Sequence, residues 1–174
     1  TQLREPDWPK VDFIVGNPPF LGNKLLRRQL GDEYVDDLFA FWKGRVPNGV
    51  DLCCYWFEKA RLQIERGLCR RAGLLATQGI RGGPNREILK RIKESGEIFF
   101  AESDRPWILD GANVHVSMVG FDNGGEKLRI LDGHPESAIL SNLTSSSADT
   151  TNARKLDENA VVAFIGSTKK APLD

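Results

Sequence analysis

The segment VDFIVGNPPF, at residues 11–20, constrains the fold of this 174-residue chain more than any other. It begins with a continuous apolar run, which is typical of a strand buried on both faces of a parallel sheet. Pro18 and Pro19 then end the strand, because proline has no backbone N–H to donate to a neighbouring strand. A buried strand is therefore followed by a rigid tip that carries a carboxamide and an aromatic ring, those of Asn17 and Phe20.

Strands and helices alternate along the rest of the chain. Short apolar runs predict strands, and apolar residues at three- and four-residue spacing predict helices. The expected strands cover residues 10–16, 73–79, 97–102, 112–121 and 126–133, and the expected helices cover residues 34–45, 51–66 and 85–94. This alternation predicts an α/β fold with a largely parallel sheet, in which sites lie at the carboxyl ends of strands. The Asn-Pro-Pro-Phe tip lies at such an end.

Local signals give further expectations. Asp51 is the first residue of the segment predicted as a helix, residues 51–66, and is expected to cap that helix. The Asn-Gly-Gly turn at residues 123–125 favours a hairpin between the two strands that flank it. Residues 141–152 are poor in apolar side chains, as is typical of a linker, and residues 160–166 have the pattern of one more strand.

Composition limits the possible classes of function. The 24 Lys and Arg residues balance 24 Asp and Glu residues, so any contact with nucleic acid must rest on a local patch. No stretch approaches the roughly 20 apolar residues that a membrane span needs, and no signal peptide is visible. The three cysteines lack metal-ligand spacing, so we expect no metal site and a reducing, cytoplasmic setting.

The tip offers the groups that a planar ring with an exocyclic amine needs. The Asn17 side chain and the Pro18 carbonyl can accept the two amine hydrogens, and Phe20 offers a flat face for stacking. Two acceptors can bend a conjugated amine towards tetrahedral geometry and aim its lone pair at an electrophilic methyl group. Catalysis then depends on positioning and on stabilising positive charge. The alternative is an ordinary strand-ending turn, and these four residues by themselves favour neither interpretation.

The wider sequence resembles a known family. A strand that ends in GNPPF is similar to motif IV of the S-adenosylmethionine-dependent amino-methyltransferases. Further segments resemble the methyltransferase part of combined type II restriction–modification enzymes, in which an endonuclease, an adenine-N6 DNA methyltransferase and a target-recognition region share one chain. These segments are "GRVPNGVDLCCYWFEKA", "GLLATQGIRGGPNREILKRI", "RPWILDGANVHVSMVGF" and "RKLDENAVVAFIGSTK".

The resemblance implies a fold and a division into domains. Residues 1–135 would form the C-terminal half of a Rossmann-like methyltransferase sheet, mostly parallel, with the strand at 112–121 as its last and antiparallel member. Residues 136–174 would be a linker and the start of the target-recognition region.

The resemblance also implies a catalytic group made of Asn17, Pro18, Pro19 and Phe20. Asn17 and Pro18 would bind the amine of an adenine flipped out of DNA, and Phe20 would stack on that base. Asn17 would also contact the cofactor, S-adenosylmethionine.

Three more residues are candidates for binding the DNA substrate. Lys24 belongs to a basic cluster that could contact phosphates, Arg81 follows the second of the expected strands, and Trp107 lies in a loop expected before the last sheet strand. For Lys24 a solvated loop is an equal alternative, and for Arg81 a tight glycine turn is the simpler one.

The chain departs from the family at the cofactor site. The family binds its cofactor at a Gly-containing turn after the first sheet strand and at an acidic residue after the second, and neither lies upstream of Asn17 here. Since the chain also begins with Thr, we expect it to be part of a longer protein and inactive by itself. Its partners would be DNA, the N-terminal half of the methyltransferase domain and an endonuclease domain in the same parent chain.

Other functions stay open. Asn-Pro-Pro before an aromatic residue also occurs in methyltransferases that act on guanine N2 in ribosomal RNA or on a protein glutamine. In the family, Ser at position 17 would favour cytosine N4, whereas Asn17 favours adenine, and the downstream segments favour DNA. A non-catalytic DNA-binding module and a dimer formed through an exposed strand edge are further alternatives.

Overall fold

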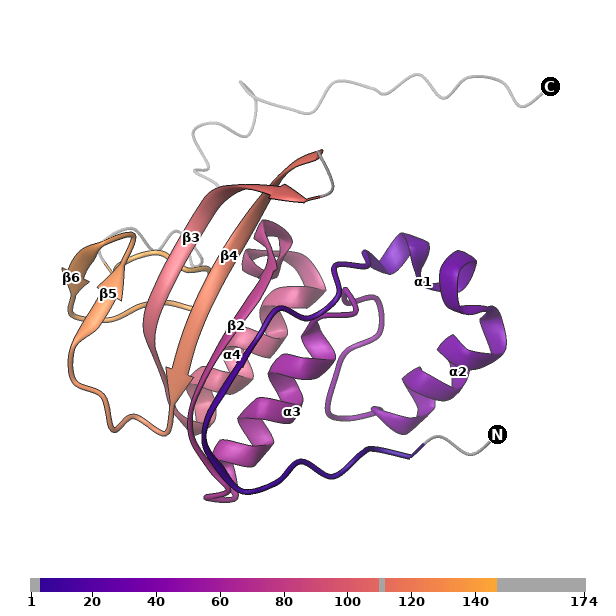
Figure 1. The fold of residues 1–174 in the computed structure, drawn as a ribbon, viewed down its shortest axis with the longest axis horizontal. Coiled ribbons are helices and arrows are strands. Elements are labelled where there is room, and N and C mark those ends of the chain that lie inside the picture. The colour runs from indigo at the N-terminus through magenta and orange to yellow at the C-terminus, as the bar shows by residue number, and fades with distance from the viewer. Residues whose placement is uncertain (1–3, 110–111, 147–174) are drawn as a thin grey trace, which may run out of the picture.

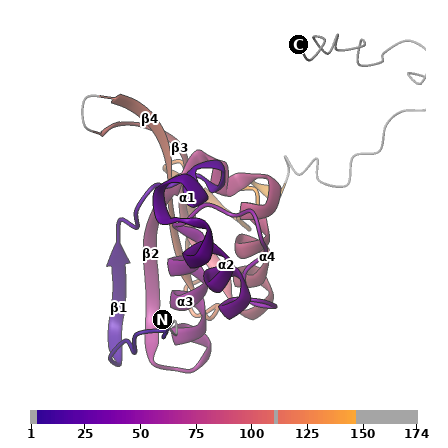
Figure 2. The ribbon, with the colours of Figure 1, turned by 90° about the vertical axis from the view of Figure 1, so that its right-hand side faces the viewer.

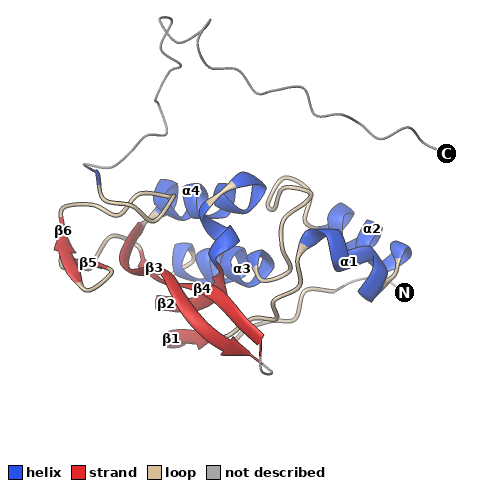
Figure 3. Ribbon diagram, turned by 90° about the horizontal axis from the view of Figure 1, so that it is seen from above, coloured by secondary structure: helices blue, strands red, loops and turns tan. Residues whose placement is uncertain are grey.

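The computed structural model describes residues 4–109 and 112–146, which form a sheet with helices against one of its faces (Figures 1 and 3). The sheet has six strands in the order β1-β2-β4-β3-β5-β6. The strands are β1 (Val11–Gly16), β2 (Cys69–Thr77), β3 (Glu97–Leu109), β4 (Ala112–Asp122), β5 (Arg129–Leu131) and β6 (His134–Glu136). The helices are α1 (Asn23–Leu30), α2 (Asp32–Phe41), α3 (Cys54–Glu65) and α4 (Arg86–Ser95), with short 3₁₀ turns η1 (Gln78–Arg81) and η2 (Gly83–Asn85).

The direction of the strands identifies the kind of sheet. β1 pairs in parallel with β2, and β3 pairs in parallel with β5. β4 lies between β2 and β3 and is antiparallel to both, while β6 is antiparallel to β5. β1, β2, β3 and β5 therefore run the same way, and the strand expected at 112–121 is reversed. This confirms the predicted α/β fold, with a mostly parallel sheet in which the strand at 112–121 runs the other way.

Helices α3 and α4 cover one face of the sheet and form the core with it (Figure 3). Phe57 of α3 stacks on Phe121 of β4, with ring centroids 6.0 Å apart and planes 19° apart. Leu89 and Ile92 of α4 and Leu74 of β2 are fully buried in the same cluster. Each such side chain contributes about 1.5–3 kcal/mol by leaving water. Among the described residues, none of the helices is long and apolar enough to cross a membrane.

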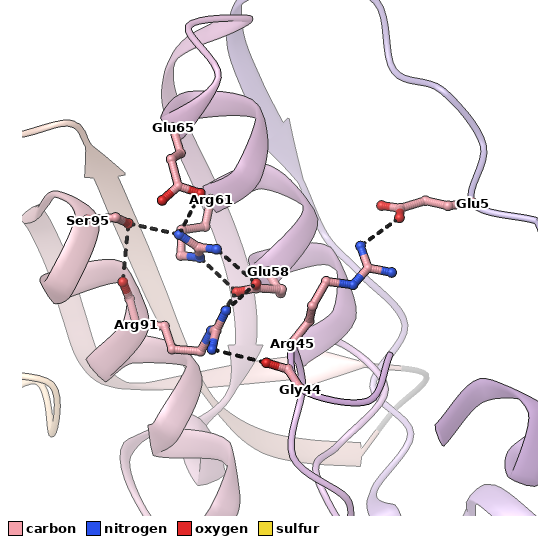
Figure 4. Close-up of polar contacts among 8 residues, drawn as sticks. All are labelled: Glu5, Gly44, Arg45, Glu58, Arg61, Glu65, Arg91 and Ser95. Atoms are coloured by element: carbon pink, nitrogen blue, oxygen red, sulfur yellow. Dashed lines mark hydrogen bonds and ion pairs between the residues drawn. The ribbon is translucent and has the colours of Figure 1, made fainter. Parts of the chain in front are cut away.

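A buried charge cluster joins α3 to α4 (Figure 4). Glu58 of α3 is fully buried, and Arg61 donates to its two carboxylate oxygens from Nε at 2.8 Å and Nη2 at 3.0 Å. Arg91 of α4 donates to the same oxygens at 3.1 and 3.3 Å. Arg61 also reaches Ser95, and Arg91 reaches the carbonyl of Gly44. Because the buried carboxylate is bound on both sides, the cluster fixes the two helices against each other.

The opposite face of the sheet is open near β1, which is one of the two edge strands (Figure 2). Phe13 and Val15 are 60% and 84% exposed. With Leu75, Phe99 and Met118 they line a shallow apolar recess of about 370 Å³. Burial of β1 on both faces, which its apolar run predicts, is therefore wrong for the described residues. Only β2 pairs with β1, and helices α3 and α4 lie against the other face of the sheet.

The predicted hairpin after β4 is also wrong. β5 pairs with β3 and β6 rather than with β4. β4 already has β2 and β3 as neighbours, so it has no free edge to offer. The turn is held instead by the carboxylate of Asp122, which accepts from the backbone N–H groups of Gly124 at 2.8 Å and Glu126 at 2.9 Å.

The C-terminal part of the described chain packs against the core. Ile139 and Leu143 are buried members of the main cluster, and Ile139 forms an isolated bridge with Ser145. The expected linker therefore begins inside a packed segment. The strand predicted over residues 160–166 lies outside the described residues.

Candidate functional site

The Asn-Pro-Pro-Phe tip directly follows the last residue of β1. The Asn17 side chain is exposed, Pro18 is buried and Phe20 is half-buried. A hydrogen bond from the N–H of Leu21 to the carbonyl of Pro19, at 3.2 Å, closes a tight turn after the prolines. The buried Pro18 thus anchors a tip that presents the Asn17 carboxamide to solvent.

The carboxyl ends of three strands meet at this edge, because β1, β2 and β3 run in the same direction (Figure 1). After β2, Arg81 in η1 donates to the carbonyl of Ser103 at 3.4 Å and lies 3.7 Å from the carboxylate of Asp104. Ser103 and Asp104 belong to β3. Arg81, predicted to bind DNA, therefore connects the turn after β2 to the middle of β3, with a side chain that is one-third exposed.

Trp107 lies within β3 and not in a loop, contrary to the sequence-based expectation. β3 and β4 continue past the sheet as an antiparallel arm, in which Trp107 pairs with Val114 (Figure 2). Pro106 is tolerated in this strand because β5 pairs with β3 only as far as Ala101, which leaves the outer edge of the arm free of ladder bonds. Trp107 is 36% exposed and Ile108 is 79% exposed. The arm therefore carries apolar side chains into solvent beyond the sheet.

The basic cluster after the tip lies on α1. Lys24 is exposed. Arg27 is paired within the chain, since it donates to Asp36 at 2.7 Å and to Asp32 at 3.1 Å. These hydrogen bonds, that to Asp36 first, raise the pKa of Arg27. Acidic residues of α2 therefore balance Arg27, while Lys24 remains a candidate for phosphate contact.

One carboxylate has contacts that the sequence did not predict. Asp51 does not cap α3, which begins at Cys54. Its side chain instead accepts hydrogen bonds from the backbone N–H of Asn23 and from the side chain of Asn85. No local pattern predicts these contacts, because the partners lie 28 and 34 positions away.

The predicted residues thus share one edge of the sheet without bonding to one another. Among the described residues, no hydrogen bond or ion pair joins Asn17 to Lys24, Arg81 or Trp107. In the same part of the chain, no group of three or more His, Cys, Asp or Glu residues could hold a metal ion. The edge therefore offers an amide, aromatic rings and cations, which suit binding and orientation of a planar polar group.

Comparison with known proteins gives three findings. No curated protein matches the chain. Among solved structures, the type IIL restriction–modification enzyme MmeI in complex with DNA matches with a TM-score of 0.61 and 24% identity over 77% of this chain and 20% of that one. A modification subunit described for a type I restriction enzyme from Vibrio vulnificus YJ016 matches with a TM-score of 0.50 and 14% identity over 67% of this chain and 23% of that one.

These structural likenesses show the fold, and the chain spans about a fifth of the length of each solved protein. The family model described as the MmeI DNA-methyltransferase domain matches residues 3–132. Since this match covers well over half of the sequence and includes the Asn-Pro-Pro-Phe tip, the chain belongs to the family of MmeI DNA-methyltransferase domains.

Proposed function

We propose that this chain is the substrate-binding half of a DNA methyltransferase that methylates the N6 amine of adenine within a larger restriction–modification protein. The observation that carries the proposal is the placement of the tip. In a chain of this family, Asn17 is exposed and Phe20 is half-buried at the carboxyl end of β1. Strand β2 lies between β1 and the reversed strand β4.

In the proposed mechanism the tip holds the target amine. The Asn17 carboxamide oxygen and the Pro18 carbonyl accept the two amine hydrogens, which aims the nitrogen lone pair away from the ring plane. Phe20 stacks on the base, which must leave the duplex to reach the tip. Pro19 stiffens the turn, because the residue before each proline is kept out of helical geometry.

The proposed cofactor is S-adenosylmethionine, which supplies an electrophilic methyl group. The exposed carboxamide of Asn17 fits a polar contact with it, since this side chain lies at the edge where the amine would be held. The acceptor groups of the tip also favour the positive charge that develops on the amine.

DNA contacts are proposed on both sides of the tip. Lys24 on α1 is suited to a phosphate, and Arg81 adds a cation at the end of β2. Trp107 and Ile108 on the arm offer apolar surface to the bases or sugars that surround a flipped nucleotide. The solved structure of MmeI is a complex with DNA, which supports DNA as the class of substrate.

The uncovered side of the sheet favours the view that further parts of the protein complete the catalytic unit. We propose that the N-terminal, cofactor-binding half of the domain pairs with the free edge of β1 and covers the exposed Phe13 and Val15. An endonuclease domain in the same parent chain is a further part of the proposal. A cytoplasmic setting suits it as well, since the three cysteines of the chain are free thiols.

The proposal is tested by a methylation assay on the longer protein that contains this chain. Labelled S-adenosylmethionine is offered together with duplex DNA, ribosomal RNA or release-factor protein. Transfer to DNA is expected. Transfer only to RNA or to protein would replace the proposed substrate, and DNA binding without transfer would indicate a non-catalytic module.

A further inference from the structure

One carboxylate joins three segments at the carboxyl edge of the sheet. Asp51 lies in the loop before α3. Its Oδ1 accepts from the backbone N–H of Asn23 at 2.9 Å, and its Oδ2 accepts from Nδ2 of Asn85 at 2.8 Å. The hydroxyl of Thr77 lies 3.5 Å from the same Oδ2. The three partners come from the start of α1, the turn before α4 and the end of β2.

Asn85 forms a reciprocal pair with Asp51. The backbone N–H of Asp51 donates to Oδ1 of Asn85 at 2.8 Å, while Nδ2 of Asn85 also lies 3.3 Å from the carbonyl of Gly79. Each side chain of the pair therefore bonds to the other residue. Two such bonds fix both the distance and the orientation of the loop before α3 relative to the turn after β2.

The packing around the pair leaves little room. A Cβ at Gly79 would lie 3.3 Å from the hydroxyl of Thr77 and 3.6 Å from both Asp51 and Asn85. A Cβ at Gly22 would lie 3.7 Å from Oδ1 of Asp51. Gly22 precedes α1 and has no side chain to cap the helix, so Asp51 satisfies the first N–H of α1 from a distant part of the sequence.

The same loop holds the segment that directly follows the tip. The N–H of Leu52 donates to the carbonyl of Leu21 at 2.9 Å, one residue after Phe20. Together with the bond between Asp51 and Asn23, this ties residues 21–23 to the loop by two hydrogen bonds. The chain after the tip is therefore held by the loop before α3, and the tip itself is anchored by the buried Pro18.

We propose that Asp51 is a positioning residue, which together with Asn85 holds the Asn-Pro-Pro-Phe tip in register with the end of β2. The inference rests on the proposed function and deepens it. Asp51 contacts neither base nor cofactor in this account. Its effect passes through residues 21–23 to Asn17 and Phe20, whose placement decides how the amine is aimed.

The test is an exchange of side chains in the longer protein that contains this chain. Asp51→Asn keeps the shape but replaces one acceptor by an amide donor, which must face the donor of either Asn85 or Asn23. The double variant Asp51→Asn with Asn85→Asp restores one donor and one acceptor at that contact. Asp36→Asn is the matched control, because it removes an exposed carboxylate that binds only Arg27 among the described residues.

Steady-state methylation should separate positioning from stability. Asp51→Asn should lower kcat by about tenfold or more and leave KM for DNA within about twofold, because the loss affects aim and not the DNA-binding surface. The double variant should recover most of the loss, and Asp36→Asn should match the wild type. An Asp51→Asn enzyme with unchanged kcat, or a double variant no better than the single one, would overturn the proposal.

Hydrogen exchange distinguishes failure of this inference from failure of the proposed function. Amides at residues 21–26 should exchange faster in Asp51→Asn and return to wild-type rates in the double variant, whether or not the protein methylates DNA. If the wild type transfers no methyl group but this pattern holds, the proposed function fails and only the anchoring stands. If exchange at these residues is unchanged by Asp51→Asn, the positioning role itself is wrong.

Discussion

Polar side chains have different surroundings on the helix-covered face of the sheet and at the carboxyl ends of its strands, called the edge here. On the face, the carboxylate of Glu58 is fully buried and is bound by two guanidinium groups (Figure 4). At the edge, the Asn17 carboxamide is exposed at the end of a strand. The face uses polar side chains to join helices, whereas the edge leaves one exposed to solvent. Substitutions in the two regions should therefore change different quantities, one stability and the other catalysis.

The largest expected effect is on the face. Glu58→Ala leaves Arg61 and Arg91 without their buried partner and should lower the free energy of unfolding by about 3–5 kcal/mol. Urea unfolding of the chain measures this change. Glu94→Ala, at an exposed position on α4, is the control and should stay within about 0.5 kcal/mol of wild type. Equal effects of the two substitutions would show that the cluster does not stabilise the face.

At the edge, Asn17→Ala should act on catalysis and spare stability. Loss of one positioned acceptor is expected to lower kcat for DNA methylation by about 10²–10³-fold. The unfolding midpoint should stay unchanged, because the side chain is exposed. Asn48→Ala, at another exposed position, is the control. A fall in the unfolding midpoint that accounts for the lost activity would remove the distinction between edge and face.

Phe20→Ala should have the next largest effect. Loss of a stacking face costs about 1–3 kcal/mol, measured as lower kcat/KM for DNA, and Phe20→Trp should retain most of the activity. Phe41→Ala, at an exposed aromatic position on α2, serves as the control. If Phe20→Trp were as inactive as Phe20→Ala, shape and not stacking would explain the role of this residue.

The smallest effect concerns phosphate contact and compares two cations on one helix. Lys24→Ala should weaken DNA binding and reduce the salt dependence of log K by about one unit of slope. Arg27→Ala should change both little, because Arg27 is already engaged by Asp32 and Asp36. Binding titrations at several salt concentrations measure the two variants. The opposite ranking would mean that the acidic residues of α2 release Arg27 when DNA binds.

The sequence predicted the parts of the molecule that depend on local pattern. The apolar run ending in two prolines predicted β1 and its tip, and three- and four-residue spacing predicted α3 and α4, whose inward residues include Phe57 and Ile92. These features follow from short-range periodicity, so one sequence is enough to find them. The resemblance to the methyltransferase family predicted that the strand at 112–121 is reversed.

Long-range partners decided what the sequence could not predict. Asp51 was expected to cap its own helix but binds Asn23 and Asn85 instead. The turn after β4 was expected to close a hairpin, but β4 was already paired on both sides. Trp107 was expected in a loop, yet it lies in β3, whose outer edge has no partner at Pro106 that needs the missing N–H. Each error came from applying a local rule where tertiary contacts compete.

The most direct test of the account is analysis of the modified nucleoside. DNA from cells that express the longer protein is digested to nucleosides, and the products from wild type and Asn17→Ala are separated by mass spectrometry. The account predicts N6-methyladenine with the wild-type protein and its loss with Asn17→Ala. N4-methylcytosine in place of methyladenine, or unchanged N6-methyladenine in the variant, would contradict the claim that this tip grips the amine of adenine.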